Sequence, residues 1–442
     1  MVGTFGMDGA ALLAAGVFAV TSVLTFLLRV GTTSQPEQAL VGGDVTTTTT
    51  HHRWRWWVGI YALTGATAVG FEMVLFRLVD AMLRSNSYTF AWVLALWLSL
   101  FGVGTAIGSF TVRRAADPRR WFLGLQFGVA ASTAASFIVA VRLLPLTPAW
   151  SPVRTWLEGD GLAGGFGGVS TGLTIVAAVI LPLLIMGVPV ALMGAALPFV
   201  QQLVSDDISQ LGNRTGTLAA GNLLGNLCGG VITTTVLVHF LGTGGAGRVL
   251  VAAQFVTVAV ATVATRGLGA RIAPSRVLAG SIAGVVFLLA MPTTNDVWQW
   301  VHGWPETPVE VAEDRSCASV AQVGADGHVQ LQLNGIGQNG WPYDDFHIAL
   351  GATPALVSNR PDRVVAVGLG IGSTSYGLLA DPRVGSVRTA ELCGGNLKLI
   401  RRLAEGRPEF DALLADQRAT FVTRDGRKLL EQQPRSLDVV VT

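Results

Sequence analysis

Long apolar runs fill the first two thirds of the chain, and each is long enough to cross a bilayer core, which needs roughly 20 residues. We count eight such runs, at about 9–30, 56–78, 89–111, 121–143, 171–198, 217–240, 247–265 and 276–292. The first has no basic region before it, so we interpret it as a membrane span rather than a signal peptide. The pattern predicts a polytopic α-helical membrane bundle: a first transmembrane helix at 1–30, a flexible polar linker at 31–55 and a seven-helix bundle at 56–293.

From about residue 294 charged residues return and the apolar runs shorten to strand length. Alternation at 309–323 and 328–333 predicts two or three strands, within a small β-strand domain at 294–360. Further on, β-branched runs alternate with helical stretches, which predicts a Rossmann-like α/β domain at 361–442 that is incomplete at its C-terminus. Its expected strands are 364–367, 387–390, 420–423 and 438–441, and its expected helices 373–380, 396–404 and 427–432.

Composition agrees with a membrane protein, because only 13% of residues are charged and the mean hydropathy is +0.52. The net charge of +2 is too small to predict a nucleic-acid partner. Cys228, Cys317 and Cys393 lack metal-ligand spacing, so we expect no metal site. We interpret the three cysteines as separate thiols, with a Cys317–Cys393 disulfide as the alternative.

Small and amide residues recur four apart in the apolar runs, which predicts close helix packing rather than a transport path. Three prolines in the fifth run predict a kinked or broken helix. The residues concerned are Gly104 and Gly108, Gly221 and Gly225, Asn222 and Asn226, and Pro182, Pro189 and Pro198.

Glu72 lies deep within an apolar run, and an ionisable group inside a membrane is functional by default. Arg77 could pair with it, although positions five apart are poorly placed on a helix. An ion pair to another helix and a proton relay are the alternatives.

Arginines fall mainly on one side of an eight-span arrangement. The positive-inside rule places that side in the cytoplasm and both termini outside. A nucleoside made in the cytoplasm favours the opposite orientation, so the side stays open. The larger set is Arg53, Arg55, Arg113, Arg114, Arg119, Arg120, Arg266, Arg271 and Arg276; the smaller is Arg84, Arg154 and Arg248.

A glycine loop, Gly368-Leu-Gly-Ile-Gly372, follows the first strand of the α/β domain. Such glycines let the backbone approach a nucleoside, and Glu391, which ends the next strand, is placed for a ribose hydroxyl. Asp425 follows the third strand, where AdoMet-type sites commonly hold an acid against the adenine amino group. The alternative for Asp425 is a helix N-cap.

From residue 56 onward the chain resembles the membrane-fused (multi-pass) bacterial spermidine synthase family of polyamine aminopropyltransferases. The order and spacing of several strings carry this resemblance. They are Leu63 to Gly65, Phe71-Glu72 with Arg77, Gly102 to Ser109, Leu192 to Pro198, Ala220 to Gly225, Leu333 to Gly335 with Gln338, His347 with Leu350-Gly351, the glycine loop, Glu391 and Asp425.

The resemblance implies a β-hairpin domain leading into a Rossmann-like domain, and transfer of an aminopropyl group from decarboxylated AdoMet to an amine such as putrescine. It places Gly368, Gly370 and Gly372 at the nucleoside, Glu391 at the ribose, Asp425 at the adenine, and Gln338, Asp345 and His347 toward the amine or its cofactor. A buried core histidine is the alternative for His347.

Departures from the family concern the amine side. Phe346-His347-Ile348 stands where the synthases have Tyr-His-Glu, and Ile371 where they have Asp. Their catalytic Asp follows the fourth strand directly, whereas this sequence ends at Thr442, so the catalytic residue stays unassigned. We expect a fragment of a longer chain or a protein inactive as a synthase.

Three functions are consistent with the sequence: a membrane-bound aminopropyltransferase, a transporter whose soluble domain senses a nucleoside or polyamine, and a scaffold with a degenerate domain. The expected location is the cell membrane. The expected partners are the lipid bilayer and a small amine, with a second copy of the chain or another membrane component as further candidates.

Overall fold

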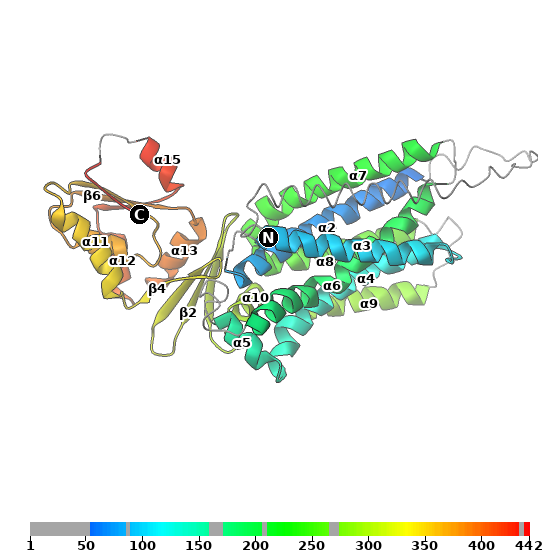
Figure 1. The fold of residues 1–442 in the computed structure, drawn as a ribbon, viewed down its shortest axis with the longest axis horizontal. Coiled ribbons are helices and arrows are strands. Elements are labelled where there is room, and N and C mark those ends of the chain that lie inside the picture. Colours follow the sequence, from blue (N-terminus) through cyan, green and yellow to red (C-terminus); the bar gives the residue numbers. More distant parts are fainter. Residues whose placement is uncertain (1–53, 85–88, 159–170, 206–209, 265–273, 433–436) are drawn as a thin grey trace, which may run out of the picture. The chain divides into compact units, whose positions relative to one another are not determined.

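The computed structural model describes residues 54–84, 89–158, 171–205, 210–264, 274–432 and 437–442 (Figure 1). The chain divides into two compact units, Met1–His51 and His52–Thr442, and the description concerns the second. The first predicted span and the linker up to residue 53 lie outside the described residues. The first described helix begins at Trp54, two residues inside the range predicted for the linker.

Helices make up the described chain up to residue 301. They are α2 (Trp54–Met82), α3 (Thr89–Val112), α4 (Pro118–Ile138), the π-helix η1 (Val139–Leu143), the short η2 (Leu144–Leu146), α5 (Trp150–Glu158), α6 (Thr171–Val204), α7 (Leu211–Ile232), the π-helix η4 (Thr233–Leu237), α8 (Val238–Ala264), α9 (Pro274–Ala290) and α10 (Thr294–Val301).

Five helices of the described chain are long and apolar enough to cross a membrane, or six if the bent pair α9 and α10 forms one span. The protein is thus a multi-pass membrane protein. Of the eight predicted spans, the run at 9–30 lies outside the described residues, and each of the other seven coincides with a described helix. Two of these predicted spans, at 217–240 and 247–265, belong to one 54-residue helical stretch, Leu211–Ala264.

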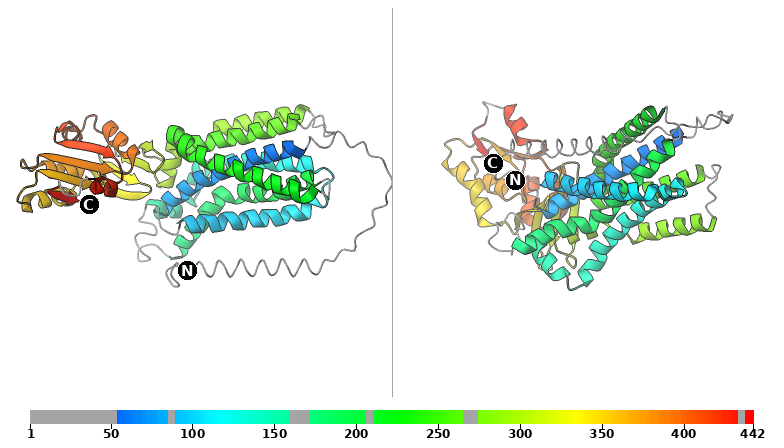
Figure 2. Two further views of the ribbon diagram at one scale, coloured as in Figure 1. Left: turned by 90° about the horizontal axis from the view of Figure 1, so that it is seen from above. Right: turned by 45° about the vertical axis from the view of Figure 1, so that its right-hand side comes forward.

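That long helix turns back at Gly242, whose φ of +69° and ψ of 176° are not helical. A glycine adopts this positive φ readily because it has no Cβ. The part before the turn, α7, runs parallel to α2, and the part after it, α8, runs antiparallel to α2, so the stretch supplies two passes. Both views of Figure 2 show α2 and α7 side by side. The neighbours are Ala62 with Gly225 and Ala66 with Gly229 on α7, and Thr67 with Gln254 and Val74 with Gly247 on α8.

Close packing at the predicted small residues is confirmed. A Cβ on Gly104 would lie 1.9 Å from the carbonyl oxygen of Ala191, and one on Gly108 would lie 2.4 Å from that of Ala195. These glycines therefore let α3 and α6 touch backbone to backbone.

The fifth run forms a continuous helix, α6, through Pro182, Pro189 and Pro198. A broken helix is therefore not found here, and the kinked helix, the other form of this prediction, stays a prediction. Prolines are tolerated inside a membrane helix because groups on neighbouring helices can bond to the backbone carbonyls that proline leaves free. α6 has such neighbours, since it packs along both α3 and α4.

Arg77, whose spacing on the helix was poor for an ion pair with Glu72, pairs elsewhere. Arg77 Nε lies 3.4 Å from Glu313 Oε2, and its guanidinium donates to the carbonyl oxygen of Cys317. Positions five apart point to different sides of a helix, so Arg77 reaches the strands beyond the bundle while Glu72 faces a cavity inside it.

An antiparallel sheet follows the helices in the order β1-β2-β3-β4. Its strands are β1 (Val309–Glu313), β2 (Ala318–Val323), β3 (Val329–Leu333) and β4 (Ile336–Trp341). The first three match the predicted alternation, and β4 was not predicted. Its burial pattern contains no fully buried residue, so it lacks the apolar alternation on which the prediction relied.

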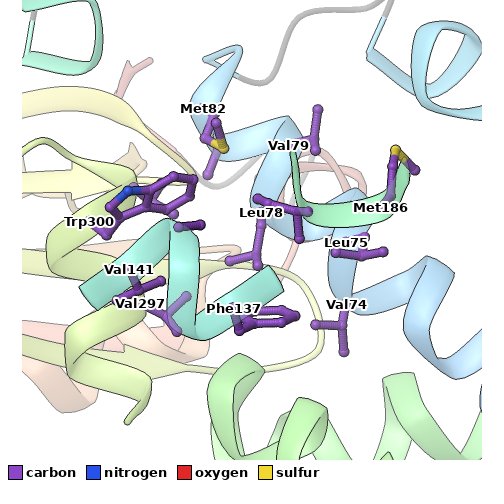
Figure 3. Packing of buried hydrophobic residues seen from close by; sticks show 14 of the residues in the cluster. Val74, Leu75, Leu78, Val79, Met82, Phe137, Val141, Met186, Val297 and Trp300 are labelled. Carbon is purple, nitrogen blue, oxygen red and sulfur yellow. The ribbon is translucent and has the colours of Figure 1, made fainter. Parts of the chain in front are cut away.

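This sheet shares a hydrophobic core with the helices. Val309 and Val320 of the strands belong to the same buried cluster as Leu78 of α2 and Trp300 of α10. Figure 3 shows Leu78, Val141 and Trp300 gathered in this core. The predicted boundary near residue 294 thus falls at α10, which contacts both β1 and the helices α2 and α8. The domain boundaries themselves stay predictions.

A parallel sheet forms the last part of the chain, in the order β7-β6-β5-β8. Its strands are β5 (Arg363–Val367), β6 (Ser386–Glu391), β7 (Ala419–Thr423) and β8 (Val439–Val441), and its helices are α11 (Asp345–Val357), α12 (Ser373–Leu379), α13 (Gly394–Leu403), α14 (Pro408–Ala415) and α15 (Gly426–Glu431). All four predicted strands are present, and α11 and α14 are additions.

Alternate residues of β5 face opposite sides of this sheet, as a strand requires. Val364 and Ala366 pack with Leu378 of α12, whereas Val365 packs with Leu429 of α15. Helices therefore cover both faces, and the carboxyl ends of β5, β6 and β7 lie at one edge.

Cys317 and Cys393 form a disulfide with a Cα–Cα distance of 5.6 Å, so the interpretation as three separate thiols is wrong. They lie 76 residues apart in sequence, and only the packing of the β1–β2 turn against the end of β6 brings them together. Cys228 is free and exposed.

Candidate nucleoside site at the edge of the parallel sheet

The glycine loop begins where β5 ends. Gly368, Gly370 and Gly372 have φ values of +96°, +53° and +101°, a region that disfavours residues with a side chain. Gly368 N–H donates to the carbonyl oxygen of Ala390 at 2.8 Å, which fixes the loop to β6. A Cβ on Gly368 would meet nothing within 4 Å, so this side of the loop is open.

Glu391 lies beside the glycine loop and bonds to its backbone, and its predicted contact with a ribose hydroxyl stays a prediction. Its carboxylate accepts from Leu369 N–H at 3.0 Å, from Cys393 N–H at 2.8 Å and from the Asn396 amide at 3.3 Å. The side chain is buried. A carboxylate has about four acceptor positions, so room for roughly one further donor such as a ribose hydroxyl remains.

Asn396 was not identified from the sequence. Its amide also donates to the carbonyl oxygen of Gly370 at 2.8 Å, and its own Oδ1 is buried with no hydrogen-bond partner. An asparagine at the third position of a helix gives no distinctive signal, and its role is visible only in the folded loop.

Gln338 and Tyr343 face the loop from the antiparallel sheet and the segment after it. Gln338 Oε1 lies 3.9 Å from the position of a Cβ on Gly370, and the Tyr343 hydroxyl lies 3.3 Å from that of a Cβ on Gly372. The Tyr343 hydroxyl is buried without a partner, and burial, with Glu409 nearby, raises the pKa of Tyr343 above its ordinary value. Gln338 was predicted for the site; Tyr343 was not.

His347 pairs with Asp344, the neighbour of Asp345; the predicted role of Asp345 toward the amine stays a prediction. Asp344 caps α11: its carboxylate accepts from His347 N–H at 2.8 Å and lies 2.9 Å from His347 Nδ1. Burial opposes ionisation of Asp344, but the bonds from His347 outweigh it and hold the pKa of Asp344 below its ordinary value. Asp345 is exposed in the first turn.

The His347 side chain is 33% exposed, so the alternative of a buried core histidine does not hold. The imidazole is accessible beside a carboxylate, which suits contact with a polar ligand. Its position toward an amine stays a prediction.

Asp425 caps α15 by accepting from Arg427 N–H at 2.9 Å, which is the structural alternative expected for it. It also lies at the same sheet edge as Glu391, because Arg424 N–H donates to the Glu391 carbonyl oxygen at 2.9 Å. The cap leaves the adenine role of Asp425 as a prediction.

Asp314 ties the antiparallel sheet to this edge. Its carboxylate accepts from Cys317 N–H at 2.9 Å and from Gly395 N–H at 3.0 Å, so it holds the start of α13 next to the disulfide. Burial raises the pKa of Asp314. Hydrogen bonds from Ser316, Cys317 and Gly395 lower it by more, so the pKa of Asp314 lies below its ordinary value.

Within the described ranges, His, Cys, Asp and Glu side chains form no group of three that could hold a metal ion. At this edge, Asn396 Oδ1 and the Tyr343 hydroxyl are buried without partners beside the open glycine loop.

Comparison with known proteins finds no matching family model and no matching curated protein. Among solved structures, spermidine synthase from Thermotoga maritima is similar at 21% identity and a TM-score of 0.27, over 30% of this chain and 47% of that one. A spermidine synthase in complex with the transition state analogue AdoDATO gives 21% identity, a TM-score of 0.27, and coverages of 30% and 46%. The chain thus spans about half the length of each.

Proposed function

We propose that this membrane protein binds an AdoMet-type nucleoside at the carboxyl edge of its parallel sheet and transfers an aminopropyl group from decarboxylated AdoMet to a small amine. The observation that carries the proposal is the glycine loop, whose Leu369 N–H donates to the Glu391 carboxylate and which Gln338 faces. Glycines with positive φ allow close approach of a nucleoside, and a buried carboxylate beneath them has capacity for a ribose hydroxyl.

In the proposed reaction the neutral amine nitrogen attacks the carbon next to the sulfonium. A carbon–nitrogen bond forms, the carbon–sulfur bond breaks with its electrons on sulfur, and methylthioadenosine leaves. The amine proton passes to a base, so a carboxylate near the amine is needed. Asp344, in contact with the accessible His347, is the carboxylate we assign to holding the amine cation.

Replacing Gly370 by alanine is expected to weaken nucleoside binding at least about tenfold. In the free protein the atom nearest to the added Cβ is Gln338 Oε1, at 3.9 Å, so the Cβ clashes with nothing there. It would instead occupy space that a bound nucleoside needs. The left-handed φ would destabilise the variant by about 1 kcal/mol, too little to unfold a domain. Calorimetric titration of the whole protein in lipid nanodiscs with decarboxylated AdoMet, AdoMet and methylthioadenosine measures the effect.

Gly406→Ala is the matched control, because Gly406 has a similar φ of +77°, has nothing within 4 Å of its Cβ position, and lies away from the loop. It should bind like the wild type. If Gly370→Ala binds equally well, the loop is not the nucleoside site. If none of the three compounds binds the wild type, the proposed function fails.

A second candidate, ligand binding or assembly outside the cytoplasm without transfer, is favoured by the disulfide. Disulfides persist in oxidising compartments and are rare in the cytosol. The arginine pattern also favours a soluble part outside the cytoplasm. Arg84, from the smaller arginine set, donates to Gln332 of the antiparallel sheet at 2.8 Å, so the sheet lies on the arginine-poor side. The arginine-rich α3–α4 connection lies one pass away, on the side that the positive-inside rule places in the cytoplasm.

A fluorescent reporter that folds only in the cytoplasm is therefore expected to stay dark when fused after Thr442. Alkaline phosphatase, which needs an oxidising compartment, should be active there. The same reporters inserted at Ala116, between α3 and α4, should give the opposite pair of results. Fluorescence at Thr442 would place the soluble part in the cytoplasm and favour the transferase over the second candidate.

A further inference from the structure

A pocket of about 230 Å³ lies among the helices of the bundle, apart from the nucleoside site, and opens past the exposed side chain of Leu98. Five helices contribute to it: α2, α3, α4, α6 and α7. Its polar and aromatic lining includes Tyr61, Glu72, Trp97, Gln126, Asn222 and Asn226. A cavity smaller than the typical 300–1,000 Å³ of drug-sized sites suits a small ligand.

Glu72 brings a carboxylate to this cavity. Arg77, the nearest cation along the helix, is occupied by Glu313, and in the described part of the chain no Lys, Arg or His forms an ion pair with Glu72. A carboxylate at membrane depth without a partner is expensive, so a ligand cation would stabilise it.

Side-chain amides form one wall. Gly65 lacks a side chain, and a Cβ there would lie 2.3 Å from Asn222 Oδ1 and 2.5 Å from the Asn226 side-chain amide, so the glycine makes the space these amides occupy. Gln126 is held in place because its Oε1 accepts from Gln254 Nε2 at 2.6 Å. Side-chain amides thus give this wall a polar surface, and Gln126 is fixed in it.

Aromatic rings and apolar side chains complete the lining. Tyr61, Trp97 and Phe101 come from α2 and α3, and Ala68 and Met193 add apolar surface. Ring faces attract organic cations, and the apolar surface suits an alkyl chain.

We propose that this cavity binds a small alkylammonium ion, with its charge at Glu72 and its alkyl chain against the rings. The lining explains the choice of ligand. A metal ion needs about six oxygen ligands, and the apolar side of the lining supplies none of them. A proton relay needs a series of ionisable groups, whereas Glu72 is the only carboxylate or histidine in this lining.

The test uses the whole protein in nanodiscs and n-butylammonium as probe, with n-butanol and sodium as comparators. Wild type is expected to bind n-butylammonium in calorimetric titration, and Glu72→Gln, which removes the charge but keeps the shape, should bind at least about tenfold more weakly. The matched control is Glu158→Gln, an exposed glutamate on α5, and it should bind like the wild type. Ala68→Leu narrows the cavity without touching the carboxylate and should also weaken binding.

Unchanged binding in both Glu72→Gln and Ala68→Leu would overturn the proposal. So would equal binding of n-butanol, which would mean a purely apolar cavity, or displacement of the probe by equimolar sodium, which would mean an inorganic cation site. Gly370→Ala is expected to bind n-butylammonium normally, so a failed nucleoside site and a failed cavity site give different results.

Discussion

Replacing Glu313 by alanine is expected to lower the free energy of unfolding by roughly 3–5 kcal/mol, because it leaves the Arg77 charge buried and unpaired. The Glu313 side chain is 3% exposed and that of Arg77 15%. Glu313 also accepts from Trp298 Nε1 at 2.6 Å and from Thr243 N–H at 3.0 Å, so three elements lose their shared acceptor. Unfolding of the whole protein by denaturant, followed by tryptophan fluorescence, measures the change.

The position of Glu313 follows from Gly242. A Cβ on Gly242 would lie 2.9 Å from Glu313 Oε1, so the glycine both turns the long helix and makes room for the carboxylate. The turn exposes Thr243 N–H, and a carboxylate there complements the positive end of the helix that restarts. Glu313 thereby joins the end of β1 to the bundle.

Glu310→Ala on the same strand is the control. Glu310 forms an exposed pair with Arg402 at 3.5 Å, and such surface pairs contribute less than about 1 kcal/mol. If Glu313→Ala is no more destabilising than Glu310→Ala, the buried pair does not hold the strands to the helices. In a double-mutant cycle, adding Arg77→Met to Glu313→Ala should recover part of the loss, because the unpaired charge is then removed.

Loss of the Cys317–Cys393 disulfide is expected to destabilise the protein by about 4 kcal/mol. The estimate comes from the chain entropy released when a loop of this length opens in the unfolded state. The two cysteines are 76 residues apart, and the closed loop contains both β5 and the glycine loop. The double variant Cys317→Ser/Cys393→Ser, unfolded alongside the wild type with and without reductant, measures the effect.

Cys228→Ser should leave stability within about 0.5 kcal/mol of the wild type, since Cys228 is free and exposed. Reductant should bring the wild type to the level of the double variant and leave the double variant unchanged. Alkylation of all three cysteines in the unreduced native protein, detected by intact mass, would contradict the disulfide and with it the argument for an oxidising compartment.

Sequence pattern was sufficient wherever the signal is local. Apolar runs located the spanning helices because a bilayer demands about 20 apolar residues in succession. Alternating β-branched residues located the strands around the glycine loop. The contact of Glu391 with Leu369 could be expected too, since consecutive parallel strands place their carboxyl ends at one edge.

Sequence pattern failed where an ordinary residue acts through its fold. Asp344 and Asp345 are adjacent and chemically identical, and only the start of α11 decides which of them caps the helix and contacts His347. The buried hydroxyl of Tyr343 and the amide of Asn396 likewise carry no motif.

The sequence by itself thus determined that this is a membrane bundle followed by an α/β domain with a glycine loop, because hydropathy and strand alternation are local properties of the chain. Tertiary structure alone decided that Arg77 pairs with Glu313, that Cys317 bonds to Cys393, and that Glu72 faces a cavity. The physical reason is that each of these depends on elements distant in the sequence, whose meeting is set by how helices and sheets pack as whole bodies.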